Sequence, residues 1–297
     1  MSESEQLPVA GYFTAADVRP LAWERIGLAI EPVRKRLRKL KYETVANVHD
    51  ARVEIRKARA TLELFAPALR RKRVEALEKT LRQLGQALGP IRDLDVLVER
   101  SFAWPLKRKR ESLVQFTYWV AEQRARLAEV ALCHLAEEPI PRRLRVGRDS
   151  LKRGPVSGAA WRQVIECRVQ EQLTHLEAPL EVEAEQDLTA MERLHERRKR
   201  CRQLRYQLEF LQSATDRDLP SKFFRDAQTC LGRIQDAAVI TQRLNSDWGE
   251  WAGKKLRADM LERQAVELSA ALSQLTAFWN AAEGWPRARD GVLSGLR

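Results

Sequence analysis

The sequence contains few of the residues that characterise several large classes of protein. Its 297 residues include four cysteines, 13 glycines and 12 prolines, and aromatic residues make up 7%. The cysteines are widely spaced without a C-x-x-C pair, which argues against a zinc ribbon, a thioredoxin-type site and a disulfide scaffold. The low glycine and proline content argues against a loop-rich all-β protein. We therefore expect reduced cysteine thiols and little β-structure.

Long apolar segments are missing as well. No run of about 18 apolar residues occurs, which is the length that a membrane-spanning helix needs. The first residues, Met1 to Gln6, are acidic and polar, and no hydrophobic region of a signal peptide follows them. We therefore expect a cytoplasmic protein that does not associate with membranes.

Charged residues, in contrast, are abundant and unbalanced. They make up 32% of the chain, and 53 lysines and arginines against 41 aspartates and glutamates give a net charge of +12. This excess favours a polyanionic partner. The length is about twice the roughly 150 residues of a typical domain, so two domains or two halves of one domain are expected.

The spacing of apolar residues predicts an all-α fold. Val48, Ala51, Ile55 and Ala58 begin a series with steps of three and four, which places them on one side of a helix. Two tandem antiparallel four-helix bundles account for the whole order of predicted helices. These helices are expected near residues 21–41, 44–70, 72–104, 107–137, 158–178, 188–213, 220–247 and 255–282.

The expected domain boundaries follow from these helices. Residues 142–157 interrupt the apolar pattern with Gly147, Gly154 and Pro155, and they are interpreted as a linker. The remaining parts are an N-terminal tail (1–20), a first half (21–141), a second half (158–285) and a C-terminal tail (286–297).

The most informative feature is an internal repeat. Residues 48–65 superpose without a gap on residues 194–211 at an offset of 146. The identical pairs are His49/His195, Arg52/Arg198, Arg56/Arg202, Arg59/Arg205, Leu62/Leu208 and Glu63/Glu209. A second block matches at an offset of 143 through Lys79/Lys222, Arg82/Arg225, Leu88/Leu231, Gly89/Gly232, Ile91/Ile234, Asp93/Asp236 and Val96/Val239. The chain is therefore interpreted as a degenerate duplication.

Each repeat places one histidine and three arginines on one side of a helix. Positions 0, +3, +7 and +10 from the histidine fall within an arc of roughly 80°. The apolar residues occupy the neighbouring arc, so this basic stripe borders the packed seam and faces a groove or the bundle interior. A single stripe of this kind is usually a solvated surface. Two copies in the same phase favour anion binding, because arginine offers a planar fork of donors to phosphate oxygens.

Acidic residues supply the internal counter-charges. Glu63 and Glu209 lie on the stripes, and Asp93 and Asp236 end the Leu-Gly-x-Ile-x-Asp segments. The glycine of each segment predicts a kink, a close approach or a left-handed residue. The aspartate either caps a resumed helix or holds an arginine in place. A symmetric metal site is not expected, because Ala238 replaces an aspartate of the first copy.

The two motifs resemble those of the CHAD family, the conserved-histidine α-helical domain. The first runs V-H-D-A-R-V-x-I-R-K-A-R-A-T-L-E-L-F-A-P from Val48 to Pro67, and L-G-P-I-R-D-L-D-V-L follows it. The second runs L-H-x-x-R-x-x-x-R-x-L-R-Y-x-L-E-F from Leu194 to Phe210, and L-G-R-I-Q-D follows it. The resemblance covers about residues 20–285.

The resemblance implies two four-helix bundles related by a pseudo-twofold axis, with basic helices lining a central groove or pore. It also implies binding of inorganic polyphosphate without catalysis. Gln203 stands where the second repeat usually has a basic residue, and Arg202 where it often has lysine, so unequal half-sites are expected. Carried over by position, the candidate ligands are His49, Arg52, Arg56, Lys57, Arg59, His195, Arg198, Arg202 and Arg205, with Lys79, Arg82, Lys222 and Arg225 added from the adjacent helices.

Two other functions stay open. A nucleic-acid-binding or adaptor role would use the same basic surface, but single-strand binders interleave aromatic platforms with basic residues, and only Tyr206 lies near a basic arc. A polyphosphate-processing enzyme would need a metal-holding carboxylate cluster or an activated nucleophile, and neither is duplicated near the stripes. We therefore expect a non-enzymatic polyphosphate-binding protein without metal or cofactor, with polyphosphate granules as a candidate location.

Overall fold

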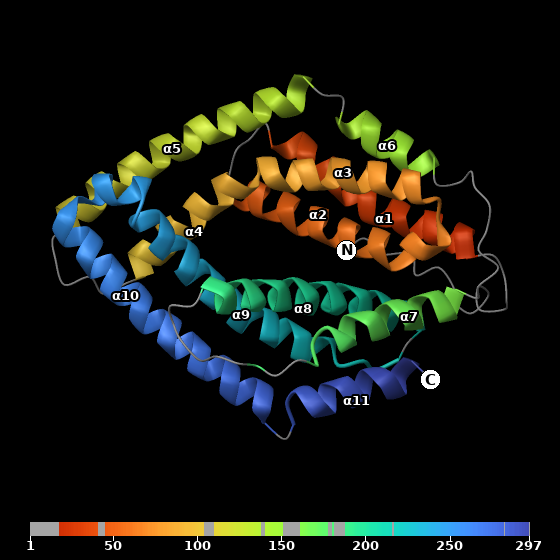
Figure 1. Cartoon of the computed structure of the whole chain (residues 1–297). Helices are drawn as coiled ribbons and strands as arrows, with labels where there is room; N and C mark the ends of the chain where they lie inside the picture. Colours follow the sequence, from red (N-terminus) through yellow and green to blue (C-terminus); the bar gives the residue numbers. More distant parts are fainter. Residues whose placement is uncertain are drawn as a thin grey trace, which may run out of the picture.

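The chain is helical throughout the part described by its computed structural model. This part comprises residues 18–40, 45–103, 110–137, 140–150, 161–177, 180, 188–215, 217–281 and 283–296. It contains no strand, so the predicted all-α fold is confirmed (Figure 1). Within the same residues, no helix is both long enough and apolar enough to cross a membrane.

Four helices form the N-terminal group. These are α1 (Val18–Lys39), α2 (Val45–Phe65), α3 (Arg71–Ala87) and α6 (Ile140–Ser150). Helices α1 and α3 each pack on both α2 and α6, so the group closes into a bundle. The apolar series predicted between Val48 and Phe65 is buried along α2, as the period of three and four requires.

Helix α6 corrects the predicted boundaries, because it occupies residues assigned to the linker. Leu144 of α6 is fully buried. Gly147 lies inside the helix, where a Cβ atom would come within 3.0 Å of Cδ1 of Leu77 on α3. The glycine therefore permits close packing between α6 and α3, and the predicted interruption of the helical pattern at this residue is wrong. Residues 151–157 of the predicted linker lie outside the described residues.

Four further helices form the C-terminal group. These are α7 (Trp161–Thr174), α8 (Leu188–Thr215), the first turns of α9 (Ser221–Leu244) and α11 (Trp285–Leu296). Helix α11 corrects the predicted C-terminal tail, since Ala288, Val292 and Leu296 are buried at steps of four. Pro286 is the second residue of this helix, and proline is well tolerated in the first turn of a helix.

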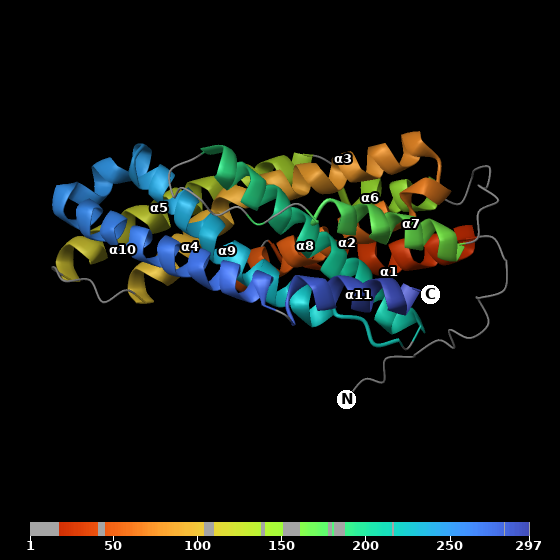
Figure 2. The ribbon, with the colours of Figure 1, turned by 60° about the horizontal axis from the view of Figure 1, so that its bottom comes forward.

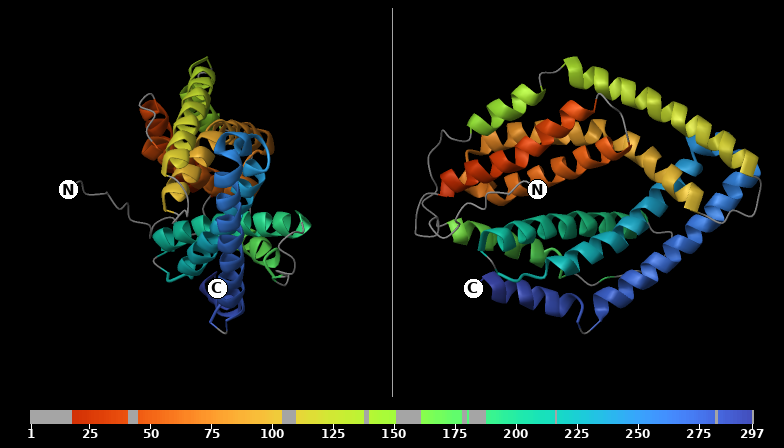
Figure 3. Two further views of the ribbon diagram at one scale, coloured as in Figure 1. Left: turned by 90° about the vertical axis from the view of Figure 1, so that its left-hand side faces the viewer. Right: turned by 180° about the vertical axis from the view of Figure 1, so that it is seen from behind.

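The remaining helices form an arm that extends from the two groups. The arm consists of α4 (Gly89–Ala103), α5 (Arg110–Glu137), α10 (Asp247–Asn280) and the last turns of α9. Helices α5 and α10 run along opposite edges of the molecule and converge at its far end (Figures 1 and 3). A separate apolar cluster holds the arm together, with Phe116, Val120 and Met260 almost fully buried.

One predicted helix, residues 72–104, is divided in two. Helix α3 ends at Ala87 and α4 begins at Gly89, one residue before Pro90. Proline has no amide hydrogen and disfavours helical backbone in the residue before it, so it interrupts the hydrogen-bond ladder. Arg233 takes the place of Pro90 in the second copy, and α9 runs through this position without interruption.

The two groups share one hydrophobic core. A single buried cluster includes side chains from α1, α2, α3 and α6 and from α7, α8, α9 and α11. Across the junction, the rings of Phe65 and Phe210 meet edge to face with centroids 5.6 Å apart. Most helices run along one long axis of the molecule in Figure 2. The internal duplication and its pseudo-twofold axis stay a prediction from the sequence.

The packing of α11 makes the first prediction. Val292 is fully buried, so Val292→Ala should lower the free energy of unfolding by about 2 kcal/mol through lost contacts and a cavity. Ser294→Ala on the exposed side of the same helix should change it by less than about 0.5 kcal/mol. Urea unfolding measures both, and equal values for the two variants would show that α11 is not part of the core.

Candidate anion-binding site

Helices α2 and α8 lie side by side and bring the two basic stripes together (Figure 1). Charge coupling crosses between them, since Arg198 acts on Arg52 and Arg56 acts on Arg202. Positions that match in the sequence repeat therefore meet in space. We define the arginine cluster as Arg52, Arg56 and Arg59 of α2 with Arg198, Arg202 and Arg205 of α8.

The arginine cluster concentrates positive charge in a partly buried place. The pKa of Arg52 and that of Arg202 are each lowered to about 10, first by burial and then by the charge of Arg56. Burial also lowers the pKa of Arg56, and Arg198 acts on it in the same direction. All of them keep their charge near pH 7, so the folded protein holds cations that repel one another. A bound anion would relieve this repulsion.

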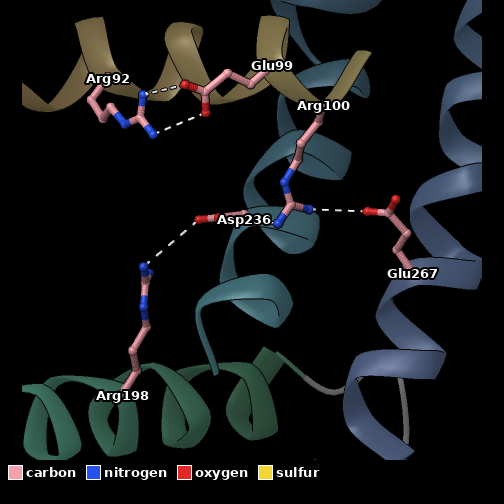
Figure 4. A network of polar contacts seen from close by, with 6 residues as sticks. All are labelled: Arg92, Glu99, Arg100, Arg198, Asp236 and Glu267. Carbon is pink, nitrogen blue, oxygen red and sulfur yellow. Dashed lines mark hydrogen bonds and ion pairs between the residues drawn. The ribbon is translucent and has the colours of Figure 1, made fainter. Parts of the chain in front are cut away.

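Two aspartates supply negative charge at one end of the cluster. Nη2 of Arg198 lies 4.0 Å from Oδ1 of Asp236, and Arg100 donates a hydrogen bond to Oδ2 at 3.3 Å (Figure 4). Burial raises the pKa of Asp93, Arg52 lowers it, and Asp236 raises it again. The interpretation that an aspartate of the repeat holds an arginine in place is therefore borne out for Asp236.

The two glycines of the repeat lie next to the arginines at this end, and Gly89 is the one that makes room for a guanidinium. A Cβ atom at Gly89 would lie 3.1 Å from Nη1 of Arg52, and one at Gly232 would lie 3.6 Å from Nη2 of Arg198. The same Nη1 of Arg52 donates a hydrogen bond to the backbone oxygen of Gly85 at 3.0 Å. Neither Gly89 nor Gly232 has a positive φ angle. Of the roles considered for these glycines, close approach is borne out for Gly89, where the approaching group is the guanidinium of Arg52, whereas the distance at Gly232 is an ordinary van der Waals contact.

Glutamates neutralise the opposite end of the cluster. Nη2 of Arg59 lies 2.6 Å from Oε1 of Glu78 on α3. Nε of Arg205 lies 3.5 Å from Oε1 of Glu209, which also accepts a hydrogen bond from Arg225 at 3.0 Å. The outermost arginine of each stripe is therefore already partnered by the protein itself.

Glu63, the acidic residue predicted on the first stripe, connects three helices. Its Oε1 accepts a hydrogen bond from Nε2 of Gln172 on α7 at 3.4 Å, and Oε1 of Gln172 accepts one from Arg200 on α8 at 3.0 Å. Burial raises the pKa of Glu63, while Arg168 and Arg200 lower it. These hydrogen bonds therefore connect α2, α7 and α8.

Among the described residues, no carboxylate forms an ion pair with the two arginines at the centre of the cluster, Arg56 and Arg202. Nε of Arg56 donates a hydrogen bond to the backbone oxygen of Arg52 at 3.1 Å. The guanidinium of Arg202 forms no hydrogen bond with a group in the described part of the chain. The phenol of Tyr206, which is 8% exposed, raises the pKa of both arginines, against the effect of burial. Arg56 and Arg202 are therefore the cations that an external anion would stabilise most.

The two histidines begin the stripes and differ in their surroundings. Burial lowers the pKa of both, and Arg92 and Arg56 lower that of His49 further. The Nδ1 atom of His195 donates a hydrogen bond to Oε1 of Gln235 at 2.7 Å, which opposes the effect of burial. Both rings are mainly neutral near pH 7, and a nearby anion would favour their protonation.

Arg92 on α4 also faces the site, although the sequence analysis did not single it out. Its guanidinium donates to both carboxylate oxygens of Glu99 at 3.1 and 3.2 Å (Figure 4). Its charge lowers the pKa of His49 and of Arg52. Gln235 occupies the matching position of the second copy. Because the two copies differ at this position, a comparison of their identical residues does not identify Arg92.

The other predicted ligands lie outside the centre. Lys57 is exposed and pairs with Glu54 at 3.1 Å, so the structure does not bring it into the cluster. Arg225 donates a hydrogen bond to Glu209, which is also the partner of Arg205 in the cluster. The last three are exposed, and their side chains form no ion pair with other described residues; they are Lys79, Arg82 and Lys222. Their role as ligands stays a prediction.

Comparisons with known proteins identify the family and the fold of the chain. A family model described as CHAD domain matches residues 27–245, which contain both stripes. The crystal structure of the CHAD domain from the plant Ricinus communis resembles the chain with a TM-score of 0.61 and 20% identity, over 95% of this chain and 92% of that chain. PptA from Streptomyces chartreusis resembles it with a TM-score of 0.59 and 15% identity, over 87% of this chain and 100% of that chain. No curated protein sequence gives a match.

The repulsion at the centre makes the second prediction. Arg202→Met keeps a long side chain and removes the charge that Arg56 and Arg198 repel. At low salt, the variant should melt about 2 °C higher, the shift that about 1 kcal/mol produces in a chain of this size. High salt should reduce the difference, because it screens the repulsion. Arg71→Met, at a side chain 90% exposed, is the matched control. An unchanged or lower melting temperature for Arg202→Met at low salt would contradict the interpretation.

The histidines make the third prediction. Because their folded pKa values are lowered, the unfolded chain takes up protons first, near its ordinary value of about 6.5. These residues therefore reduce the free energy of unfolding as the pH falls below that value. The wild type should lose more stability between about pH 7.5 and about pH 5.5 than a His49→Gln/His195→Gln variant. Urea unfolding at several pH values measures this loss. His175→Gln, at an exposed position, should follow the wild-type curve. A double variant that does the same would contradict the assignment.

Proposed function

Because the chain belongs to the CHAD family, we propose that it binds inorganic polyphosphate through the arginine cluster and catalyses no reaction. The observation that carries this proposal is the pair of arginines at the centre, Arg56 and Arg202, which form no ion pair with a carboxylate in the described part of the chain. Burial of these unpaired charges lowers the stability of the folded protein. A bound phosphate chain supplies the negative charge that offsets them.

The geometry of the cluster supports a linear ligand. Arg52 and Arg59 are seven positions apart on α2, which spans about 10 Å at 1.5 Å per residue. Arg198 and Arg205 repeat this spacing on α8. A phosphate chain that follows the two helices meets donors from both sides at successive phosphates, and the guanidinium fork suits phosphate oxygens.

Nucleic acid is the weaker alternative for the same cations. Single-stranded nucleic acid binds where bases can stack on exposed aromatic rings. The aromatic ring nearest the cluster, Tyr206, is 8% exposed and lies under the guanidinium of Arg205 at 4.3 Å. It is therefore not available as a platform for bases. An oligonucleotide of equal charge should bind less tightly than polyphosphate.

Side-chain chemistry near the cluster supports binding without turnover. Within the described residues, no group of three or more histidine, cysteine, aspartate or glutamate side chains could hold a metal ion. The nearby carboxylates of Glu78, Glu209 and Asp236 are each engaged by arginine. We therefore expect no phosphate release from polyphosphate in the presence of Mg²⁺ or Mn²⁺. Binding of this kind would recruit the protein to polyphosphate granules in the cytoplasm.

The fourth prediction tests the central pair. Arg56→Ala/Arg202→Ala should weaken polyphosphate binding about a hundredfold at low salt, because each lost charge-assisted contact contributes about 1.5 kcal/mol or more. The slope of log affinity against log salt should also become shallower, since fewer phosphates are neutralised. Calorimetry at several salt concentrations measures both quantities.

The control variant removes the same charge elsewhere. Arg71→Ala/Arg126→Ala changes two side chains that are 90% and 66% exposed on α3 and α5. It should alter the affinity by no more than about threefold, through the overall field alone. Circular dichroism checks that both variants fold. Equal losses in the two variants would move the function to the general basic surface, and no wild-type binding would refute the proposal.

A further inference from the structure

The two histidines that begin the basic stripes have different neighbours. Nδ1 of His195 donates a hydrogen bond to Oε1 of Gln235 on α9 at 2.7 Å. The position that matches Gln235 in the first copy is Arg92 on α4, whose guanidinium is engaged by Glu99 and can only donate. The ring of His49 forms no hydrogen bond with a group in the described part of the chain. The repeat therefore supplies a hydrogen-bond acceptor to one histidine and a cation to the other.

The hydrogen bond to Gln235 determines which nitrogen of His195 carries the proton. In a neutral imidazole, one ring nitrogen donates and the other accepts, and the hydrogen bond of one sets the state of the other. Because Nδ1 donates to Gln235, the neutral ring has an unprotonated Nε2. This second nitrogen forms no hydrogen bond with a group in the described part of the chain. Nε2 is therefore the atom of His195 that is left for a ligand.

His195 lies beside an arginine that the proposed function assigns to the ligand. Arg198 is three positions further along α8, so the two side chains are neighbours on one face of the helix. A phosphate bound to Arg198 therefore lies next to the imidazole ring. An unprotonated Nε2 presents a lone pair to the phosphate oxygens and repels them, whereas a protonated Nε2 donates a hydrogen bond to them.

We infer that Gln235 is a positioning residue that holds His195 with its proton on Nδ1, so that a polyphosphate chain contacts this histidine only when Nε2 takes up a proton from the solvent. The inference rests on the proposed function and adds a proton to the binding reaction. The bond from Nδ1 to Gln235 is kept, the new N–H donates to a phosphate oxygen, and the ring gains one positive charge.

The charges around His195 permit this uptake. Among the described residues, Lys199 and Arg198 oppose protonation of the ring and Glu196 favours it, and all three belong to α8. Lys199 forms an ion pair with Glu196, so their effects largely cancel. From α9, the acceptor oxygen of Gln235 favours the charged ring.

The surroundings of His49 are less favourable to a second positive charge. Arg92 of α4 and Arg56 of α2 oppose protonation more strongly than Asp50 of α2 and Glu99 of α4 favour it. No hydrogen bond fixes the tautomer of this ring, so it can donate to a phosphate as a neutral group. His195 therefore takes the larger share of the proton uptake.

The first measurement needs no ligand. Heteronuclear NMR of the imidazole rings in the full-length protein above about pH 7.5 should show the proton of His195 on Nδ1. Comparison with His195→Gln assigns its signals. Gln235→Leu removes the acceptor and should abolish this preference, whereas Gln115→Leu, at an exposed position on α5, is the matched control and should preserve it. A wild-type His195 with its proton on Nε2 overturns the inference.

The second measurement counts the protons. Calorimetry of long-chain polyphosphate in buffers of different ionisation enthalpy should show the uptake of about half a proton near pH 7, because a bound anion raises the pKa of the ring. The affinity should fall about fivefold between about pH 6.5 and about pH 8. His195→Gln and Gln235→Leu should lose most of the uptake, whereas His49→Gln should keep most of it.

The affinity at high pH separates positioning from a merely structural role. At about pH 8, Gln235→Leu should bind at least as tightly as the wild type, because a neutral His195 is then able to donate from Nε2. Gln235→Glu keeps an acceptor, and its carboxylate should extend tight binding to higher pH by stabilising the charged ring. This second variant keeps the test valid if Gln235→Leu impairs folding.

Each outcome has a distinct meaning. Full proton uptake in Gln235→Leu, or weaker binding of this variant at every pH, overturns the inference while the proposed function stands. The same holds if Gln235→Glu has the pH dependence of the wild type. If the wild type binds no polyphosphate at low salt, the proposed function and the inference both fail.

Discussion

The repulsion among arginines between α2 and α8 is the constraint on which the rest of the structure depends. Several cations in one partly buried interface repel one another, and this repulsion lowers stability unless opposite charge is near. The protein offsets the two ends of the cluster with carboxylates from α3, α4, α8 and α9. Among the described residues, no carboxylate pairs with the two central arginines. A site of this kind is stabilised by its ligand, so stability and binding are linked.

The burial of apolar side chains in the core offsets the repulsion among the arginines. One buried cluster extends through both helix groups, and the Phe65–Phe210 contact lies at their junction. The charged site and the core therefore occupy neighbouring faces of the same two helices. A stripe displaced by one residue would turn its arginines by 100° and place some of them in the core. This geometric coupling explains why the phase of the arginines is the same in both copies.

The sequence predicted local features well and distant partners poorly. Helical period and repeat comparison identified Arg56 and Arg202, because their phase is a property of one helix. Neither method could assign Glu78 to Arg59, since that pair joins two elements through the fold. Helix α6 was missed because Gly147 is read locally as a break, whereas its packing against α3 appears only in three dimensions. The absence of a carboxylate at the centre is likewise a property of several helices together.

The core shared by the two helix groups has a consequence for dissecting the molecule. A cut between α6 and α7 would leave the first fragment with α2 and half of the arginines, and the second with α8 and the other half. Each fragment would expose the apolar surface around Phe65 or Phe210 to water. The fragments would regain function only by reassociation, as a split protein does. The repeat in the sequence therefore does not correspond to two interchangeable modules.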